Sequence, residues 1–394
     1  MTAKTSWIEL DSHRRWLDRG FAQVLWFVRG SIEDTGGFAY LDRDRRPVSG
    51  RRPELFLTAR MVHTAALGYA RGLPVAGALL DHGMTSLLGA FQDDEHGGWH
   101  SRIGDATSRK SVYDHVHVGL AASTAKSVDH PRADRLLERA IDVVEAHLWD
   151  EQTRTLRESF APDWTDSEDY RGANANMHGL EAFLALGEAT GDSVWHERGL
   201  AIADRIVNHG AREHDWLVPE HYDSAWHAQP DYNRDQPDDP FRPYGATPGH
   251  SVEWARLLVE LSESRLVDAP DWLVPAAEQL VRRALDDLWG ADGRPGLVYT
   301  VDWSGEPVSQ TRLHWPVCEA IQAAAALHRV TGDWHWEQWY RVLWGHATSY
   351  FIDDHGTWIN ELDDTMHEGG TVWPGRPDVY HCGGALTGPA SRQE

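Results

Sequence analysis

A short turn motif recurs along the whole chain, and it constrains the fold more than any other feature of the sequence. Each copy has acidic or glycine residues at a turn, followed by an aromatic or large apolar residue and a polar extended segment. Six copies, spaced by about 60 to 80 residues, begin at Asp34, Asp94, Trp149, Glu213, Asp292 and Asp353. A period of this length is typical of architectures in which each repeat buries its apolar face against the next.

Between the copies the sequence predicts pairs of helices. Apolar residues recur with a period near 3.6 residues, as in 55–70 and 136–148. Gly191 and Gly332 stand where first helices should end, and Asp333 can cap a second one. The expected pairs are 53–72 with 76–92, 111–127 with 131–148, 174–190 with 193–209, 249–264 with 272–289, and 314–331 with 333–350.

A sixth pair forms only if the two ends of the chain meet. The remaining candidates are the segment after Tyr380 and an N-terminal helix near 9–29. Their pairing closes a ring of six inner and six outer helices, which is an all-α (α/α)6 barrel with short β-hairpin-like loops. Residues 1–394 then form a single domain. The alternative is an open solenoid of helix pairs, which leaves the N-terminal helix without this partner.

The composition excludes several classes of function. The 61 Asp and Glu outnumber the 37 Lys and Arg, and a net charge of −24 opposes binding to nucleic acid. No run of about 18 apolar residues predicts a membrane span, and the N-terminus lacks the apolar core of a signal peptide. Only Cys318 and Cys382 are available for a disulfide, which fits a cytoplasmic protein. We expect a monomer or a homodimer.

Two features point to a site for a small sugar. Tryptophan accounts for 20 of the 394 residues, and indole rings pack well on the apolar faces of pyranoses. The irregular segment 221–248 is rich in Pro, Asp and aromatic residues, and long ordered loops of this kind often serve as binding loops. We therefore expect this segment to lie over the mouth of the barrel.

Polar residues recur near the expected starts of the first helices of the pairs. In a closed barrel these starts meet at one end of the inner ring, where the positive ends of the helix dipoles favour a developing anion. The residues are Arg60; Tyr113, His115 and His117; Asn174 and His178; His250 and Glu253; Trp315 and Glu319; and His381. The sequence therefore predicts a shared functional site at this end.

The spacing of these residues adds detail. Asn174 and His178 are four residues apart and share a helix face, as do Trp315 and Glu319. Glu253 follows His250 by three residues, so we expect its carboxylate to orient the imidazole.

A divalent metal is the main chemical alternative, and its ligands would be Asn174, His178, His250 and Glu253. The sequence has no HExxH motif, no cysteine cluster, no glycine-rich phosphate loop and no GxSxG motif. We therefore expect neither a metal nor a cofactor, and we expect Cys318 and Cys382 to be packing residues.

Four segments resemble the N-acylglucosamine 2-epimerase superfamily, whose members fold as (α/α)6 barrels. The resemblance covers nearly the whole chain. The most C-terminal of the four segments, which begins at Pro377, is most similar to the aldose–ketose isomerase branch, which includes mannose and sulfoquinovose isomerases. The segments are Asn174-Ala175-Asn176-Met177-His178, Pro248-Gly249-His250-Ser251-Val252-Glu253-Trp254, Trp315-Pro316-Val317-Cys318-Glu319-Ala320 and Pro377-Asp378-Val379-Tyr380-His381.

The resemblance implies a metal-independent interconversion of D-mannose and D-fructose through a cis-enediol. It assigns ring opening to His250, proton transfer between C2 and C1 to His381, and stabilisation of the enediolate to Arg60. It further implies that the sugar is bound by Asn174, His178, Glu253 and Glu319, with Trp315 as a stacking platform, and by Tyr113, Phe56 and Trp373.

Several alternatives stay open at this point. Reprotonation of the same enediol at C2 gives a 2-epimerase, and a sulfonated sugar requires a further cation, for which Arg242 is the candidate. A glycoside hydrolase on the same barrel would use Glu253 and Glu319 as paired acids. A sugar-binding protein without activity would need the tryptophans but neither His250 nor His381.

Overall fold

The computed structural model describes residues 5–390, and the ends of the expected domain, 1–4 and 391–394, lie outside the described residues. It contains the predicted pairs of helices. The six inner helices are α2 (Leu55–Ala70), α4 (Val112–Ser127), α6 (Ala173–Thr190), α8 (Pro248–Ser262), α10 (His314–Thr331) and α12 (Tyr380–Thr387). The six outer helices are α1 (Asp11–Val28), α3 (Pro74–Leu87), α5 (Ala133–Val143), α7 (Val194–Ala203), α9 (Leu273–Val281) and α11 (Trp334–His346).

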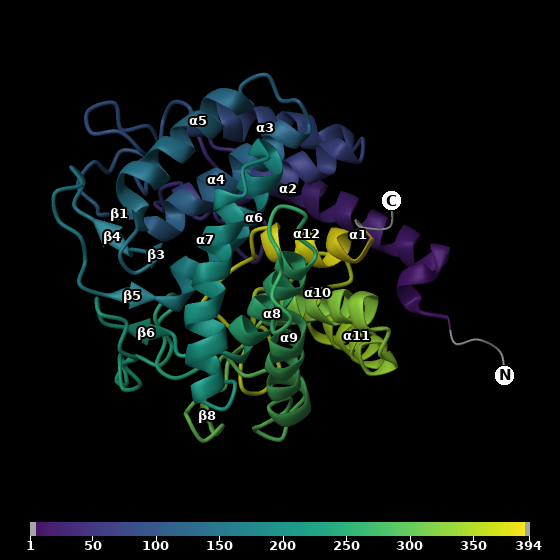
Figure 1. Cartoon of the computed structure of the whole chain (residues 1–394). Coiled ribbons are helices and arrows are strands. Elements are labelled where there is room, and N and C mark those ends of the chain that lie inside the picture. The colour runs from purple at the N-terminus through teal and green to yellow at the C-terminus, as the bar shows by residue number, and fades with distance from the viewer. Residues whose placement is uncertain (1–4, 391–394) are drawn as a thin grey trace.

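The ring is closed by the two ends of the chain, as the sequence predicts. Each inner helix contacts the next one around the ring, and α12 contacts both α10 and α2. In Figure 1 the yellow α12 lies beside the purple α1, and these two helices make the sixth pair. The fold is therefore an (α/α)6 barrel and not an open solenoid.

The two ends of the barrel differ in the length of their connections. Short turns join the inner helices α2, α4, α6, α8 and α10 to their outer partners, and Gly191 and Gly332 end α6 and α10 in the left-handed conformation that glycine adopts without strain. At the other end, long loops lead from an outer helix to the next inner helix. Four outer helices enter these loops through π-helical turns, at Val144–Leu148, Asp204–Ala211, Arg282–Asp287 and Ala347–Phe351.

Short antiparallel pairs link the long loops around the mouth of the barrel. β1 (Lys110–Ser111) pairs with β4 (Ser159–Phe160), β5 (Arg171–Gly172) with β6 (His221–Tyr222), and β9 (Arg312–Leu313) with β10 (Glu361–Leu362). Single bridges make the equivalent links between Glu54 and Arg102, Ala246 and Val301, and Leu41 and Arg376. Each link joins the residues just before one inner helix to the long loop that leads to the next inner helix. The six links therefore form a closed circle around the mouth of the barrel.

Hairpins of the expected kind occur inside individual loops. β2 (Trp149–Asp150) pairs with β3 (Thr155–Leu156), and β7 (Thr300–Val301) pairs with β8 (Pro307–Ser309). The recurrent acidic residue of the turn motif accepts backbone hydrogen bonds, as Asp353 does from the amides of His355 and Thr357. This bonding explains why an acidic residue opens the turn.

The aromatic residue of the turn motif belongs to the core. Phe38, Trp99 and Trp358 are all buried, and the Trp99 indole N–H donates to the carbonyl of Leu87 at 2.7 Å. The inner helices are buried on nearly all sides, since each packs between two inner neighbours and an outer partner. Among residues 5–390, no helix is long and apolar enough to cross a membrane.

We predict that Trp99→Ala lowers the free energy of unfolding by about 3–5 kcal/mol, because it leaves a large cavity in a well-packed core. Urea denaturation followed by fluorescence and circular dichroism measures the change. The matched control is Trp26→Ala on α1, where the side chain is 62% exposed and the expected change is below about 0.5 kcal/mol. Equal losses in the two variants would contradict the role assigned to the motif.

Candidate active site

A pocket opens at the long-loop end of the barrel, where the N-termini of all six inner helices meet. The second or third residue of each inner helix lines it. These residues are Phe56, Tyr113, Asn174, His250, Trp315 and His381. Arg60, His178, Glu253 and Trp373 line the same pocket, whereas Glu319, His115 and His117, which the sequence also selected, do not. The helix N-termini give this wall a positive electrostatic potential.

Arg60 on α2 is held in place by the neighbouring helices. Its guanidinium donates to the hydroxyl of Tyr113 at 2.6 Å and to Nε2 of His117 at 3.0 Å, and it lies 3.6 Å from a carboxylate oxygen of Asp378. Burial and the nearby Arg60 charge hold the pKa of His117 well below its usual value. Since His117 is neutral, its Nε2 accepts from Arg60, and the guanidinium keeps a fixed orientation toward the pocket.

His115 is separate from this site. Its Nδ1 lies 2.6 Å from the carbonyl of Ser111, and its Nε2 accepts from the backbone N–H of Trp99 at 3.2 Å. Burial lowers the pKa of His115 to about 4. The residue is a neutral histidine that supports a turn, although its position in the sequence resembles that of the pocket residues.

His381 is paired with a glutamate from the neighbouring inner helix. Its Nδ1 lies 2.8 Å from Oε1 of Glu319, and Trp315 lies against its ring with centroids 5.8 Å apart. Burial and the Arg60 charge hold the pKa of His381 well below its usual value, so the ring is neutral. With the Nδ1 proton donated to Glu319, Nε2 is left as an unprotonated base.

His250 has a glutamate partner that the sequence did not indicate. Its Nδ1 lies 2.9 Å from Oε1 of Glu220, a buried residue directly before β6. The expectation that Glu253 orients His250 is therefore wrong. The three-residue spacing on α8 places the two side chains on one face, but the imidazole turns toward the long loop that precedes α8, and no local pattern marks Glu220.

Glu253 is instead a buried acid that faces the pocket. It is 1% exposed, and its Oε1 lies 3.8 Å from Nε2 of His178 without a hydrogen-bond partner among the described residues. Burial and the nearby Glu319 raise the pKa of Glu253 well above its usual range, which favours the neutral carboxylic acid. Asn174 Oδ1 likewise has no partner in the described part of the chain. Both atoms are placed to bind a polar ligand.

The long loop covers the mouth of the barrel, where the sequence places it. Pro240, Phe241 and Pro243 line the pocket. The Phe241 ring lies edge-on to the rings of Trp373 and Tyr113, with centroids 5.3 and 5.7 Å apart. An apolar lid of this kind excludes water from the pocket below it.

Arg242 in this loop is not available to a negatively charged substrate, contrary to the role considered from the sequence. Its guanidinium donates to both carboxylate oxygens of Glu168, at 2.7 and 3.0 Å, and lies 3.4 Å from Glu158. It also lies over the ring of Tyr170 at 4.1 Å. These carboxylates come from another repeat, and their proximity is not visible in the sequence.

Two groups of residues in the described chain have the spacing of a metal site, namely His178, Glu181 and Glu253, and Glu253, Glu319 and His381. Neither is the combination expected from the sequence, because His250 belongs to neither group. The guanidinium of Arg256 bonds to Glu181 at 2.9 Å and to Glu319 at 2.8 Å. A fixed positive charge between these carboxylates repels a metal cation, so the donor set fits a metal poorly.

Comparisons with known proteins place this geometry in context. The family model of N-acylglucosamine 2-epimerase matches residues 36–385. A D-mannose isomerase of Pseudomonas cannabina pv. alisalensis is 43% identical, over 96% of this chain and 92% of the relative. A D-mannose isomerase of Thermobifida fusca is 45% identical, over 96% and 94%. The crystal structure of a D-mannose isomerase superposes with a TM-score of 0.87 at 26% identity, over 95% of this chain and 97% of the other.

Proposed function

This chain belongs to the N-acylglucosamine 2-epimerase family, and we propose that it is a D-mannose isomerase that interconverts D-mannose and D-fructose. The observation that carries the proposal is the pair of buried His–Glu contacts, His250–Glu220 and His381–Glu319, whose imidazoles both lie against Trp315 in one pocket. The two D-mannose isomerases at 43% and 45% identity support the choice of substrate.

The reaction moves protons and needs no hydride acceptor. His250 assists opening of the pyranose by transferring a proton between O1 and the ring oxygen, and Glu220 stabilises its charged form. His381 Nε2 then removes the proton from C2 of the open-chain aldose and delivers it to C1, while the hydroxyl proton of O2 passes to O1 in the enediol, which leaves the carbonyl at C2. One histidine can perform both steps because the proton that it takes from C2 stays on Nε2 until it is delivered to C1.

The intermediate is an enediolate, and its negative charge is met by Arg60. This guanidinium is always charged and is fixed by Tyr113 and Asp378. The neutral acid of Glu253 is suited to donate a hydrogen bond to a substrate oxygen, and it avoids the repulsion that a carboxylate would exert on the enediolate. Asn174, His178 and Trp315 complete the wall that binds the sugar.

We further propose that the whole chain is one catalytic domain that acts in the cytoplasm, as a monomer or homodimer, without a metal or cofactor. Both cysteines are free and buried, which suits a reducing compartment. The hydrolase alternative is less well supported because Glu319 is engaged by His381 and Arg256 and does not line the pocket.

The test is to incubate the purified, EDTA-treated protein with D-mannose, D-lyxose, D-glucose and sulfoquinovose in separate reactions and to measure initial products by chromatography. We expect D-fructose from D-mannose. D-Glucose as the first product from D-mannose would indicate a 2-epimerase, and turnover of sulfoquinovose alone would overturn the mannose assignment. The pairing of Arg242 with Glu168 predicts that sulfoquinovose is a poor substrate.

We predict that Glu220→Gln lowers kcat/KM for D-mannose by about tenfold or more, because His250 loses the carboxylate that stabilises its charged form. Steady-state kinetics at several pH values measures the effect. The matched control is Glu213→Gln, an exposed residue that leads into the same loop, and it should leave kcat/KM within about twofold. An unchanged kcat/KM in Glu220→Gln would show that His250 does not depend on this contact.

A further inference from the structure

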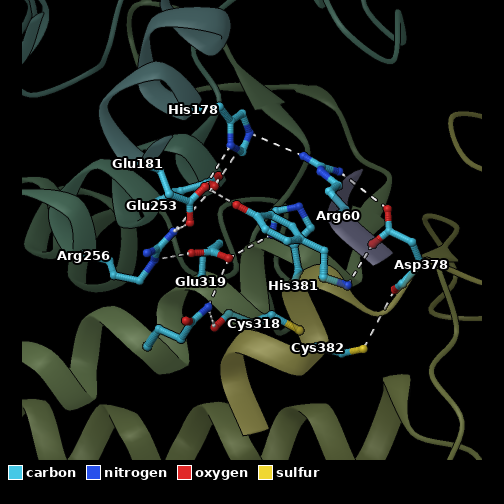
Figure 2. Close-up of polar contacts among 12 residues, drawn as sticks. Arg60, His178, Glu181, Glu253, Arg256, Cys318, Glu319, Asp378, His381 and Cys382 are labelled. Carbon is cyan, nitrogen blue, oxygen red and sulfur yellow. Dashed lines mark hydrogen bonds and ion pairs between the residues drawn. The ribbon is translucent and has the colours of Figure 1, made fainter. Parts of the chain in front are cut away.

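Arg256 lies beneath the floor of the pocket, surrounded by carboxyl groups. It belongs to α8, is 7% exposed, and does not line the pocket. Figure 2 shows its guanidinium between Glu181, Glu253 and Glu319. It bonds to Oε2 of Glu319 at 2.8 Å and to Glu181 at 2.9 Å, but approaches Glu253 only to 4.0 Å. The described part of the chain thus places one guanidinium among several buried carboxyl groups.

Two of these carboxyl groups cannot both be ionised at low cost. Glu253 and Glu319 are each 1% exposed, and both offer an oxygen within 4.8 Å of the other and of His381. Burial raises the pKa of Glu319, and the Arg256 charge opposes this rise. Burial and Glu319 raise the pKa of Glu253 well above its usual range. The direct contact with Arg256 therefore favours the charge on Glu319 and the proton on Glu253.

The location of that charge determines what His381 can do. An ionised Glu319 accepts the Nδ1 proton of His381, which leaves Nε2 free to take a proton from the substrate. A protonated Glu319 would donate to Nδ1 instead, and the ring would then carry its own proton on Nε2. In that tautomer His381 cannot act as the base.

We propose that Arg256 is a positioning residue that keeps Glu319 ionised and thereby fixes the tautomer in which His381 acts as the base. The inference rests on the proposed function and assigns Arg256 no contact with the sugar. Gln322 assists it by donating to Oε1 of Glu319 at 3.1 Å. The titratable and charged groups that face Glu319 from the neighbouring helices are Arg256 and Glu253 on α8, His178 and Glu181 on α6, and His381 on α12, and Tyr380 on α12 donates to Glu181.

The direction of the pH effect follows from the charge of Arg256. Glu319 and His381 titrate as a pair, and the active form of the pair carries one proton fewer than the inactive form. A nearby positive charge disfavours added protons, so it lowers the pH at which the pair becomes inactive. Loss of the charge raises that pH, and the acidic limb of the kcat profile moves upward.

The experiment compares Arg256→Gln and Arg256→Lys with the wild type, using D-mannose as substrate from pH 5 to pH 9. In Arg256→Gln we expect the acidic limb to move up by about one pH unit or more, so that kcat measured on that limb falls about tenfold or more, while KM stays within about threefold. Arg256→Lys keeps the charge, so its acidic limb should stay near that of the wild type. An acidic limb in Arg256→Gln that coincides with the wild-type limb would overturn the proposal.

The matched control is Arg329→Gln. Arg329 on α10 bonds to Glu263, just after α8, at 2.6 Å, so it links the same two helices as Arg256 and Glu319 but lies away from His381. This variant should keep the wild-type kcat, KM and pH profile. A shift of its acidic limb equal to that of Arg256→Gln would show that the effect reflects helix packing alone, and it would overturn the proposal.

Two further measurements cover the case in which Arg256→Gln does not fold. Gln322→Glu adds a like charge beside Glu319, so its acidic limb should also move upward, and an unmoved limb would contradict the inference. Histidine ¹⁵N NMR reads the His381 tautomer directly. We expect the proton on Nδ1 in the wild type, and a proton on Nε2 there would overturn the inference. The NMR measurement of the tautomer does not require turnover of the substrate. Failure of the proposed function would be seen separately, because the wild-type protein would then leave D-mannose unchanged.

Discussion

His381→Ala is expected to lower kcat for the conversion of D-mannose by about 10³-fold or more, because the variant lacks the base that moves the proton between C2 and C1. The imidazole is buried against Trp315 and held by Glu319. Initial rates of fructose formation measure the loss, and the KM for D-mannose should change far less than kcat.

The matched control for this variant is His196→Asn. His196 is as buried as His381, but it lies on the outer helix α7, where its Nδ1 contacts the hydroxyl of Ser264 at 2.6 Å. We expect this variant to lose stability and to keep kcat within about threefold. If His381→Ala retained more than about a tenth of the wild-type kcat, the assignment of the base would be wrong.

The second large effect is expected for Arg60→Gln, which should lower kcat by about 10²–10³-fold. The guanidinium is the fixed positive charge in the pocket wall that meets the enediolate, and removal of one such donor typically costs this much. Its loss also leaves Tyr113 and Asp378 without their shared partner. Arg60→Lys should recover only part of the activity, because lysine lacks the planar fork that contacts both His117 and Tyr113.

Arg198→Gln serves as the control for Arg60. Arg198 on α7 has the same low exposure, and it donates to both oxygens of Glu145 at 2.5 and 2.9 Å. Loss of this ion pair should reduce stability without a selective loss of kcat. Comparable losses of kcat in Arg60→Gln and Arg198→Gln, measured at a temperature where both variants are folded, would contradict a direct role for Arg60.

The fold was predictable because its signals are local. A helix of the inner ring is marked by its apolar period, and the end of α6 or α10 is marked by a glycine at the required left-handed position, Gly191 or Gly332. The closure of the ring also followed from the sequence, since α1 and α12 were the helices left without a partner in their own repeat.

The polar residues at the starts of the inner helices could be selected in the same way. They recur in the first two turns of the inner helices, at the second, third or sixth position, so one end of the barrel collects them. His115 shows the limit of this reasoning, because its position is similar while its ring supports the turn at Trp99.

Contacts between residues far apart in the sequence were not predictable from spacing. Glu220 reaches His250 across 30 residues, and Arg256 bonds to Glu181 and Glu319 across 75 and 63 residues. In one sequence each of these is an isolated charged residue without a periodic signal. Local spacing favoured Glu253 as the partner of His250, whereas the folded chain gives Glu253 a different environment and a different protonation state.

The central claim is that a proton moves through a cis-enediol and that His381 moves it. Proton NMR of the EDTA-treated protein with D-mannose in deuterated water, followed until equilibrium, tests this claim most directly. We predict that fructose forms, that deuterium accumulates at its C1 over repeated turnovers, and that both changes are lost in His381→Ala. Fructose that reaches equilibrium without deuterium at C1, or unchanged labelling in His381→Ala, would contradict the account.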